Sequence, residues 1–113
     1  MKNGLKVYKD GTKYWYKDDL LHREDGPAVE WTDGIKFWYL HDQLHRVDGP
    51  AVEYSDGSKY WYLHDQLHRM DGPAEEYADG SKCWWIHGIN LAEKYNCHDQ
   101  ETFEKLLKIL AFE

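Results

Sequence analysis

The stretch LHREDGPAVEWTDGIKFWYLHDQ, residues 21–43, decides the fold, because residues 44–66 and 67–89 repeat it with few changes. The segment before it, residues 5–20, fits the second half of the same unit and forms a leading half-unit. A constant period of 23 residues is typical of proteins in which each unit packs mainly against its neighbours along the chain. The sequence therefore predicts a repeat array over residues 1–90.

Each unit reads as short strands joined by tight turns. Asp-Gly pairs recur once per unit between β-branched and aromatic residues, at 10–11, 33–34, 56–57 and 79–80. Asp-Gly is a strong β-hairpin signal, because a two-residue type I′ turn needs positive φ at both central positions. A second two-residue turn follows each aromatic strand, at 18–19, 41–42, 64–65 and 87–88. We therefore expect a mainly β fold, an elongated antiparallel β-hairpin repeat with a shallow core.

The two kinds of turn also set which side chains share a face of the sheet. With two residues in every turn, Glu30 faces Phe37 and Trp38 faces His45. One face then carries Val29, Trp31, Trp38, Leu40 and His45, and the other carries Glu30, Phe37, Tyr39, Leu44 and Arg46, with counterparts in the other units. A difference of one residue in either turn would exchange the faces.

The pattern changes after Asn90, where the alternation of the strands is lost. An apolar stripe at helical spacing follows, made of Phe103, Leu106, Leu107 and Leu110. We expect residues 91–113 to form an α-helical cap over the open end of the sheet, since a repeat array must cover its last edge. The alternative is a helix that binds a partner or dimerises.

The composition indicates one folded, acidic domain. Of the 113 residues 16% are aromatic, which is rare in disordered chains, and the formal net charge is −7. This charge argues against duplex DNA or an anionic membrane as partner, because phosphate binding needs clustered Lys and Arg. No apolar run is long enough for a membrane span, so we expect a cytoplasmic protein. Cys83 and Cys97 are the two cysteines and indicate neither a disulfide framework nor a thiolate zinc site.

The histidines recur beside the second turn, and HDQLH at 41–45 and 64–68 superficially matches the zinc motif HExxH. That motif requires helical spacing, whereas these segments span hairpin turns and recur with the structural period. Because the chain also lacks a Gly-x-Ser-x-Gly elbow, we expect no metal, no cofactor, no catalytic residue and no enzymatic activity. His22, His45 and His68, placed opposite tryptophans by this register, are expected to respond to pH.

The arginines at 23, 46 and 69 form a column that has two interpretations. In the structural one, each guanidinium stacks on an aromatic neighbour and pairs with a carboxylate of its own unit, from Glu30, Glu53 or Glu76 or from the Asp of Asp-Gly-Pro. In the functional one, the arginines beside aromatic rings grip a phosphate and stack a base, so that the protein is a sponge for a nucleotide signal. The glutamate column counts against the second.

The acidic turns suggest a third role. Aspartates at the hairpin tips would line one edge of the array at regular spacing, as in an acidic mimic of nucleic acid; they are Asp10, Asp33, Asp56 and Asp79. Turn chemistry alone also produces such a row.

The segments Trp38-Tyr39, Leu44-His45-Arg46 and Asp48-Gly49-Pro50-Ala51, with their equivalents in the other units, resemble a divergent MORN-type repeat. The resemblance covers residues 14–91, and the His-Asp turns depart from the Asn-Gly of that pattern. MORN-like proteins of this kind occur in bacteriophages and giant viruses. The resemblance implies a β-hairpin array used for contact, without a shared catalytic residue, and a viral protein in the cytoplasm of its host.

We therefore expect a non-enzymatic viral accessory protein that binds a host protein, as an inhibitor of an antiviral defence component. The expected contact residues are Tyr39, Tyr62 and Trp85 as aromatic anchors, with Arg46 and Arg69 as polar clamps. The uncovered strand edge at residues 5–9 also predicts self-association with another copy.

Overall fold

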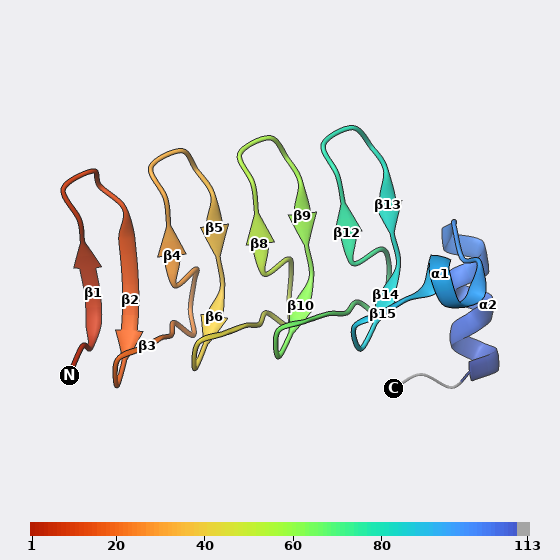
Figure 1. Cartoon of the computed structure of the whole chain (residues 1–113), viewed down its shortest axis with the longest axis horizontal. Helices are drawn as coiled ribbons and strands as arrows, with labels where there is room; N and C mark the ends of the chain where they lie inside the picture. Colours follow the sequence, from red (N-terminus) through yellow and green to blue (C-terminus); the bar gives the residue numbers. More distant parts are fainter. Residues whose placement is uncertain (111–113) are drawn as a thin grey trace.

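The computed structural model describes residues 1–110 and confirms a mainly β fold that ends in helices (Figure 1). Hairpins stand side by side in sequence order, and the molecule measures 48 × 29 × 20 Å along its principal axes. The expected C-terminal cap reaches to residue 113, and its last three residues lie outside the described part.

One antiparallel sheet of nine strands runs through all units in the order β1-β2-β4-β5-β8-β9-β12-β13, with β3 paired to β2. These strands are β1 (Gly4–Val7), β2 (Lys13–Lys17), β3 (Leu20–Leu21), β4 (Val29–Glu30), β5 (Lys36–Phe37), β8 (Val52–Glu53), β9 (Lys59–Tyr60), β12 (Glu75–Glu76) and β13 (Lys82–Cys83). Each unit extends the ladder of the one before it: Val52 lies opposite Phe37 of the preceding unit on one side and Tyr60 of its own unit on the other.

Three two-stranded ladders form the second turns of the full units. They are β6 (Tyr39–Leu40) with β7 (Gln43–Leu44), β10 (Tyr62–Leu63) with β11 (Gln66–Leu67), and β14 (Trp85–Ile86) with β15 (Ile89–Asn90). The expected two-residue turn is confirmed here, since Leu40 pairs with Gln43 and both turn residues have positive φ, 49° at His41 and 65° at Asp42.

The Asp-Gly turns contain three residues, so the predicted two-residue turn is wrong there. The Trp31 N–H donates to the Ile35 carbonyl at 2.9 Å, and the Gly34 N–H donates to the Trp31 carbonyl at 3.0 Å. Only the glycine of the Asp-Gly pair has positive φ, 95° at Gly34. The Asp33 carboxylate instead accepts the Ile35 N–H at 3.1 Å. A type I turn followed by a left-handed glycine spares the aspartate a left-handed backbone, which a type I′ turn would impose.

This extra residue shifts the hairpin register, and the predicted faces change with it. Val29 pairs with Phe37, and Glu30 pairs with Lys36. Val29 and Trp31 therefore lie on the face of Phe37 and not on that of Trp38, while Glu30 moves to the face of Trp38. The predicted association of Trp38 with Leu40 and His45 does not depend on this turn.

The C-terminal segment covers the end of the array with α1 (Leu91–Tyr95) and α2 (Gln100–Leu110). Phe103 is fully buried and packs in a cluster with Trp84, Ile86, Leu91 and Cys97. The Trp84 Nε1–H donates to Gln100 Oε1 at 2.8 Å, which ties α2 to the last unit. Among residues 1–110, neither helix is long and apolar enough to cross a bilayer.

Candidate functional site

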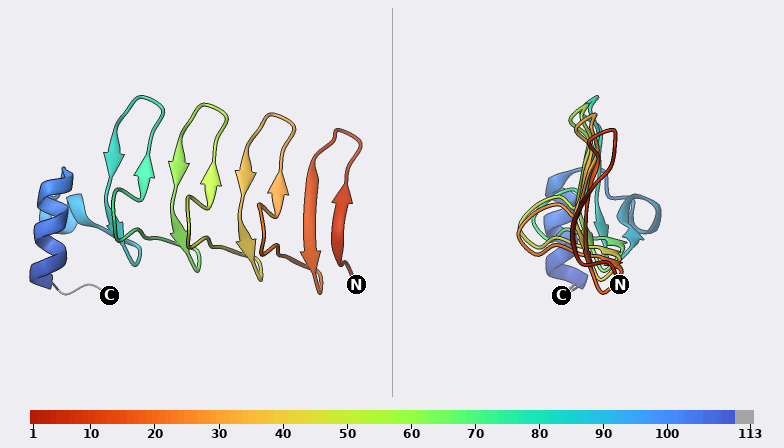
Figure 2. Two further views of the ribbon diagram at one scale, coloured as in Figure 1. Left: turned by 180° about the vertical axis from the view of Figure 1, so that it is seen from behind. Right: turned by 90° about the vertical axis from the view of Figure 1, so that its left-hand side faces the viewer.

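The sheet presents two different faces along the whole array. The indole face carries the tryptophans Trp15, Trp38, Trp61 and Trp84, and the loops that follow β3, β7 and β11 leave the sheet on this side (Figure 2). The tyrosine face carries a second set of rings, namely Tyr8, Tyr14, Tyr16, Trp31, Phe37, Tyr39, Tyr54, Tyr60, Tyr62, Tyr77 and Trp85. Each face is a candidate for binding, and they differ in what already covers them.

On the indole face an arginine covers each of the first three tryptophans. The Arg46 guanidinium carbon lies 4.0 Å from the Trp38 ring centroid. Its Nε donates to Asp48 at 2.9 Å, and its Nη1 donates to the Pro50 carbonyl at 3.1 Å. Nη1 is also 3.6 Å from a Glu53 oxygen. The stacking and pairing expected of the arginine column are therefore confirmed, and the same contacts recur at Arg23 and Arg69.

The Asp-Gly-Pro-Ala segment is built around this guanidinium. Besides Asp48 and Pro50, a Cβ on Gly49 would lie only 2.8 Å from the Arg46 guanidinium carbon, so glycine leaves the space that the stacked arginine fills. Ala51 is fully buried and its carbonyl accepts the Trp38 N–H at 2.7 Å. The hydrogen bond and charge of Arg46 lower the pKa of Asp48. The most conspicuous residues of the repeat are thus occupied in holding each unit against the tryptophan of the unit before it.

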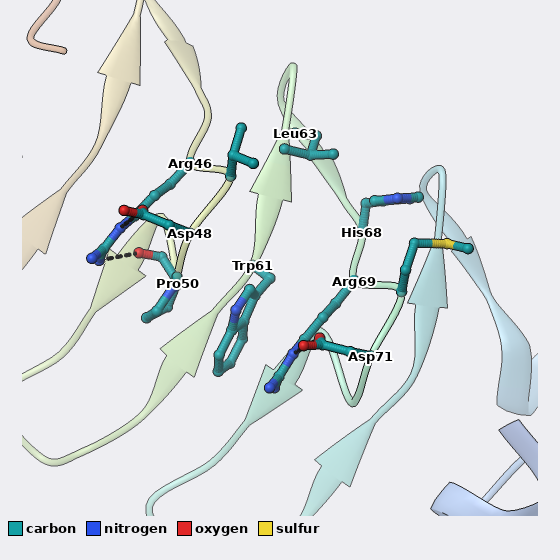
Figure 3. A pocket seen from close by; sticks show the side chains of 11 residues that line it. Arg46, Asp48, Pro50, Trp61, Leu63, His68, Arg69 and Asp71 are labelled. Atoms are coloured by element: carbon teal, nitrogen blue, oxygen red, sulfur yellow. Dashed lines mark hydrogen bonds and ion pairs between the residues drawn. The ribbon is translucent and has the colours of Figure 1, made fainter. Parts of the chain in front are cut away.

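Between successive loops the indole face is hollowed into open grooves. The larger one, of about 690 Å³, runs between the loops of Arg46 and Arg69 and has Trp61 on its wall (Figure 3). Asp48 and Asp71 stand beside the two guanidinium groups, as Figure 3 shows. Because the charge of each arginine is already matched by carboxylates, the groove offers little attraction to a phosphate.

The histidines connect successive second turns of the array. His45 Nδ1 accepts the backbone N–H of His64 at 3.0 Å, and the two rings are 4.3 Å apart. The pairs His22–His41 and His68–His87 repeat this contact. Burial, and then the charge of the neighbouring histidine, lower the pKa of His45 and of His68. Within residues 1–110 no three His, Cys, Asp or Glu side chains are arranged to hold a metal ion.

The aspartate of the second turn also links one second turn to the strand that follows the second turn before it. Asp65 Oδ1 accepts the Leu44 N–H at 2.6 Å, and the Leu44 carbonyl accepts the Asp65 N–H at 2.9 Å. Asp42 makes the same pair of bonds with Leu21. A glycine at this position would fit the left-handed backbone more easily but could not accept this hydrogen bond. The His-Asp turn therefore connects successive second turns along the array.

The tyrosine face is a continuous row of partly exposed rings. Tyr54 lies 5.5 Å from Tyr60 and Tyr60 lies 5.8 Å from Tyr77, both edge to face. Every ring of this face keeps some exposure to solvent, and Tyr8, Trp31 and Tyr54 are the most exposed of them. The loops that cover the indole face project from the other side of the sheet. Along the array this face therefore remains accessible.

Carboxylates surround these rings. Burial raises the pKa of Tyr39, and the charges of Asp65 and Asp42 add to the effect. Burial likewise raises the pKa of Tyr62, with Glu75 as the largest charge contribution. The phenols therefore stay neutral near pH 7, and the face lies in a negative field that disfavours anionic ligands.

The structure brings together only part of the predicted contact set. Tyr39, Tyr62 and Trp85 lie on the tyrosine face, whereas Arg46 and Arg69 stack on the indole face, on the opposite side of the sheet. The predicted anchors and clamps therefore cannot grip one small ligand jointly.

Sequence reasoning missed Glu75 and Tyr77, which lie beside Trp85 on the tyrosine face. The signal for Glu75 was available, because it breaks the repeat where the two earlier units have valine.

No protein-family model, curated protein or solved structure matches this chain significantly. The function is therefore inferred from the geometry of the two faces and from the resemblance of the repeat.

Proposed function

We propose that this chain is a non-enzymatic binding module that docks on a partner protein through its tyrosine face. One observation carries the proposal: the arginines, the loops and α2 already occupy the indole face, whereas the rings of the tyrosine face remain accessible along the array. Tyr39, Tyr62 and Trp85 are the anchors of the proposed contact.

Rings of this kind suit a protein interface. Tyr and Trp bury a large area with only two side-chain torsions to immobilise, and they are enriched among the residues that dominate binding energies. Here the strands hold them in a fixed row, so little order is lost on binding. The resemblance to MORN-type repeats of viruses extends the proposal to a viral accessory protein whose partner is a component of host antiviral defence.

The two other functions expected from the sequence have less support. A nucleotide sponge would need free guanidinium groups beside the tyrosines, but Arg46 and Arg69 are paired and lie on the other face. A nucleic-acid mimic would use the aspartates at the hairpin tips. These carboxylates accept turn N–H groups, as Asp56 does from Ser58 at 2.8 Å, so turn formation alone accounts for their presence.

Affinity capture with matched variants tests the proposal. Tagged protein is incubated with bacterial lysate, and bound proteins are identified by mass spectrometry for wild type, for Tyr39→Thr with Tyr62→Thr, and for Val47→Ala with Met70→Ala. The control pair removes two exposed apolar side chains beside the groove of the indole face. Circular dichroism and urea unfolding confirm that each variant is folded.

We expect one partner to be retained by the control variant and lost by the tyrosine-face variant. The opposite result, or retention by both, would contradict docking through this face. A gain of several degrees in melting temperature with millimolar nucleotide, abolished by Arg46→Ala with Arg69→Ala, would support the sponge instead.

A further inference from the structure

The third unit departs from the other two at one spot on the tyrosine face. Val29 and Val52 are each 4% exposed, and Glu75 stands at the equivalent position between Tyr60 and Cys83. Placing a carboxylate where the fold otherwise buries a valine is unfavourable unless the charged group finds partners. The requirements of the repeat fold therefore do not explain why Glu75 replaces valine.

Two further departures surround this carboxylate. Trp85 replaces the tyrosine of the earlier units, and its Nε1–H donates to Glu75 Oε1 at 2.7 Å. The Tyr77 hydroxyl donates to the other carboxylate oxygen at 2.9 Å. Cys83 replaces an aromatic ring and is the strand partner of Glu75, so one ring is missing beside the carboxylate. All three departures, at positions 75, 83 and 85, meet in one place.

Both observed donors to Glu75 are neutral. A carboxylate has about four acceptor positions, so its charge and about half of its hydrogen-bonding capacity stay available. Glu53 and Glu76, in contrast, each lie within ion-pair distance of an arginine on the indole face. In the part of the chain from 1 to 110, no Lys, Arg or His forms an ion pair with Glu75.

The rings next to Glu75 complete the surroundings of a cation site. Tyr60 and Tyr77 meet edge to face at 5.8 Å, and Tyr62 lies near enough for the Glu75 charge to influence it. Aromatic faces around an anion attract a cation through the ring quadrupole as well as through charge. A guanidinium fits best, because it is planar, stacks on rings and donates along its edge to a carboxylate.

We propose that Glu75, with Tyr62, Tyr77 and Trp85, is the specificity-determining site of the tyrosine face and receives an arginine side chain of the partner protein. This inference rests on the proposed function and adds the chemistry of the partner. The negative field of the face, to which Asp42 and Asp65 contribute, favours the same cationic partner.

The direct test uses a small probe and its neutral analogue. N-acetyl-arginine methylamide and N-acetyl-citrulline methylamide are titrated at constant ionic strength, and the Trp85 indole N–H is followed by nitrogen–proton correlation spectra. The variants are Glu75→Gln, which can still accept the Trp85 N–H, and Glu75→Val, which restores the residue of the earlier units. Glu53→Gln removes one charge from the indole face as the matched control.

We expect a saturable shift with the arginine probe at millimolar concentration, weakened at least about tenfold in both Glu75 variants and unchanged in Glu53→Gln. The citrulline probe should give no saturable shift. Equal binding of citrulline, retained binding in Glu75→Gln, or no saturation by about 50 mM arginine probe would overturn the inference.

Capture of the partner separates the two proposals. If Glu75→Val still captures the partner fully while Tyr39→Thr with Tyr62→Thr does not, the arginine site is refuted and docking through the tyrosine face stands. If the tyrosine-face variant captures the partner as well as wild type does, the proposed function itself fails.

Discussion

Replacing Gly49 by alanine should destabilise the fold only when Arg46 is present. The new Cβ would lie 2.8 Å from the Arg46 guanidinium carbon, which is closer than real Cβ contacts allow, and 3.1 Å from Nε and Nη2, which is tight. Gly49 is not among the residues with positive φ, so its backbone accepts alanine without strain. The guanidinium must therefore move away from position 49, which disturbs its contacts with Trp38 and the Pro50 carbonyl.

The contacts that Arg46 would lose determine how much Gly49→Ala destabilises the fold. A cation–π contact at a partly exposed site contributes about 0.5–1 kcal/mol, and the bond to the Pro50 carbonyl adds about 1 kcal/mol. Alanine itself stabilises the folded state by roughly 0.5 kcal/mol, because it restricts the conformations of the unfolded chain. We expect Gly49→Ala to cost about 1 kcal/mol in wild type and to stabilise by roughly 0.5 kcal/mol in Arg46→Ala, a coupling energy of about 1.5 kcal/mol.

Urea unfolding followed by tryptophan fluorescence measures this cycle. Equal effects of Gly49→Ala in both backgrounds would refute the idea that the glycine exists to admit the guanidinium. The pairs Gly26 with Arg23 and Gly72 with Arg69 show the same close approach and provide two internal repetitions of the experiment.

Three further predictions concern the cap, the histidines and the second turn. In urea unfolding, Phe103→Ala should cost about 3–5 kcal/mol because Phe103 is fully buried. Ile109→Ala, at a site 75% exposed, should cost less than about 0.5 kcal/mol. Similar costs for the two variants would contradict the packing of α2. Folding lowers the pKa values of His45 and His68, so the native state binds fewer protons than the unfolded state. The free energy of unfolding should therefore be unaffected by these histidines above about pH 6.5. Below that pH it should fall by at most about 1.4 kcal/mol per pH unit for each histidine. His45→Asn with His68→Asn should flatten unfolding free energies measured between pH 7 and 5, and an equally steep slope in the variant would contradict this origin. Asp65→Asn should stay within about 0.5 kcal/mol of wild type, whereas Asp65→Ala, which loses the Leu44 bond and strains a φ of 64°, should cost about 2 kcal/mol. Equal costs for the two variants would exclude a stabilising bond between Asp65 and Leu44.

Much of the fold could be predicted because the period, the aromatic strands and the turn residues agree at every unit. The register could not, because Asp-Gly satisfies both a type I′ turn and a type I turn followed by a left-handed glycine. These turns differ by one residue, and in a strand one residue moves Val29 and Glu30 to opposite faces. The second turn has no glycine in most units, so a turn that ends in a left-handed glycine was not an alternative there.

The candidate site was predictable only in part, because the strand pattern does not show where the chain runs after each second turn. Tyr39 and Tyr62 share a face because they occupy the same position of the repeat. The arginines were assigned to that face as well, but after His45 the chain leaves the sheet and places Arg46 over Trp38 of the preceding unit. Glu75 is visible in the sequence as a departure from the repeat, but its partners Tyr77 and Trp85 become evident only once the register is known.

Photo-crosslinking from single positions tests most directly whether the tyrosine face is the contact surface. Replacing Tyr62 or Val47 by p-benzoylphenylalanine puts a photoreactive ring either on the tyrosine face or on a loop of the indole face, where Val47 is 83% exposed. After irradiation in bacterial cells, we predict a single crosslinked partner from position 62 and none from position 47. A crosslink from position 47 with none from position 62 would contradict the account.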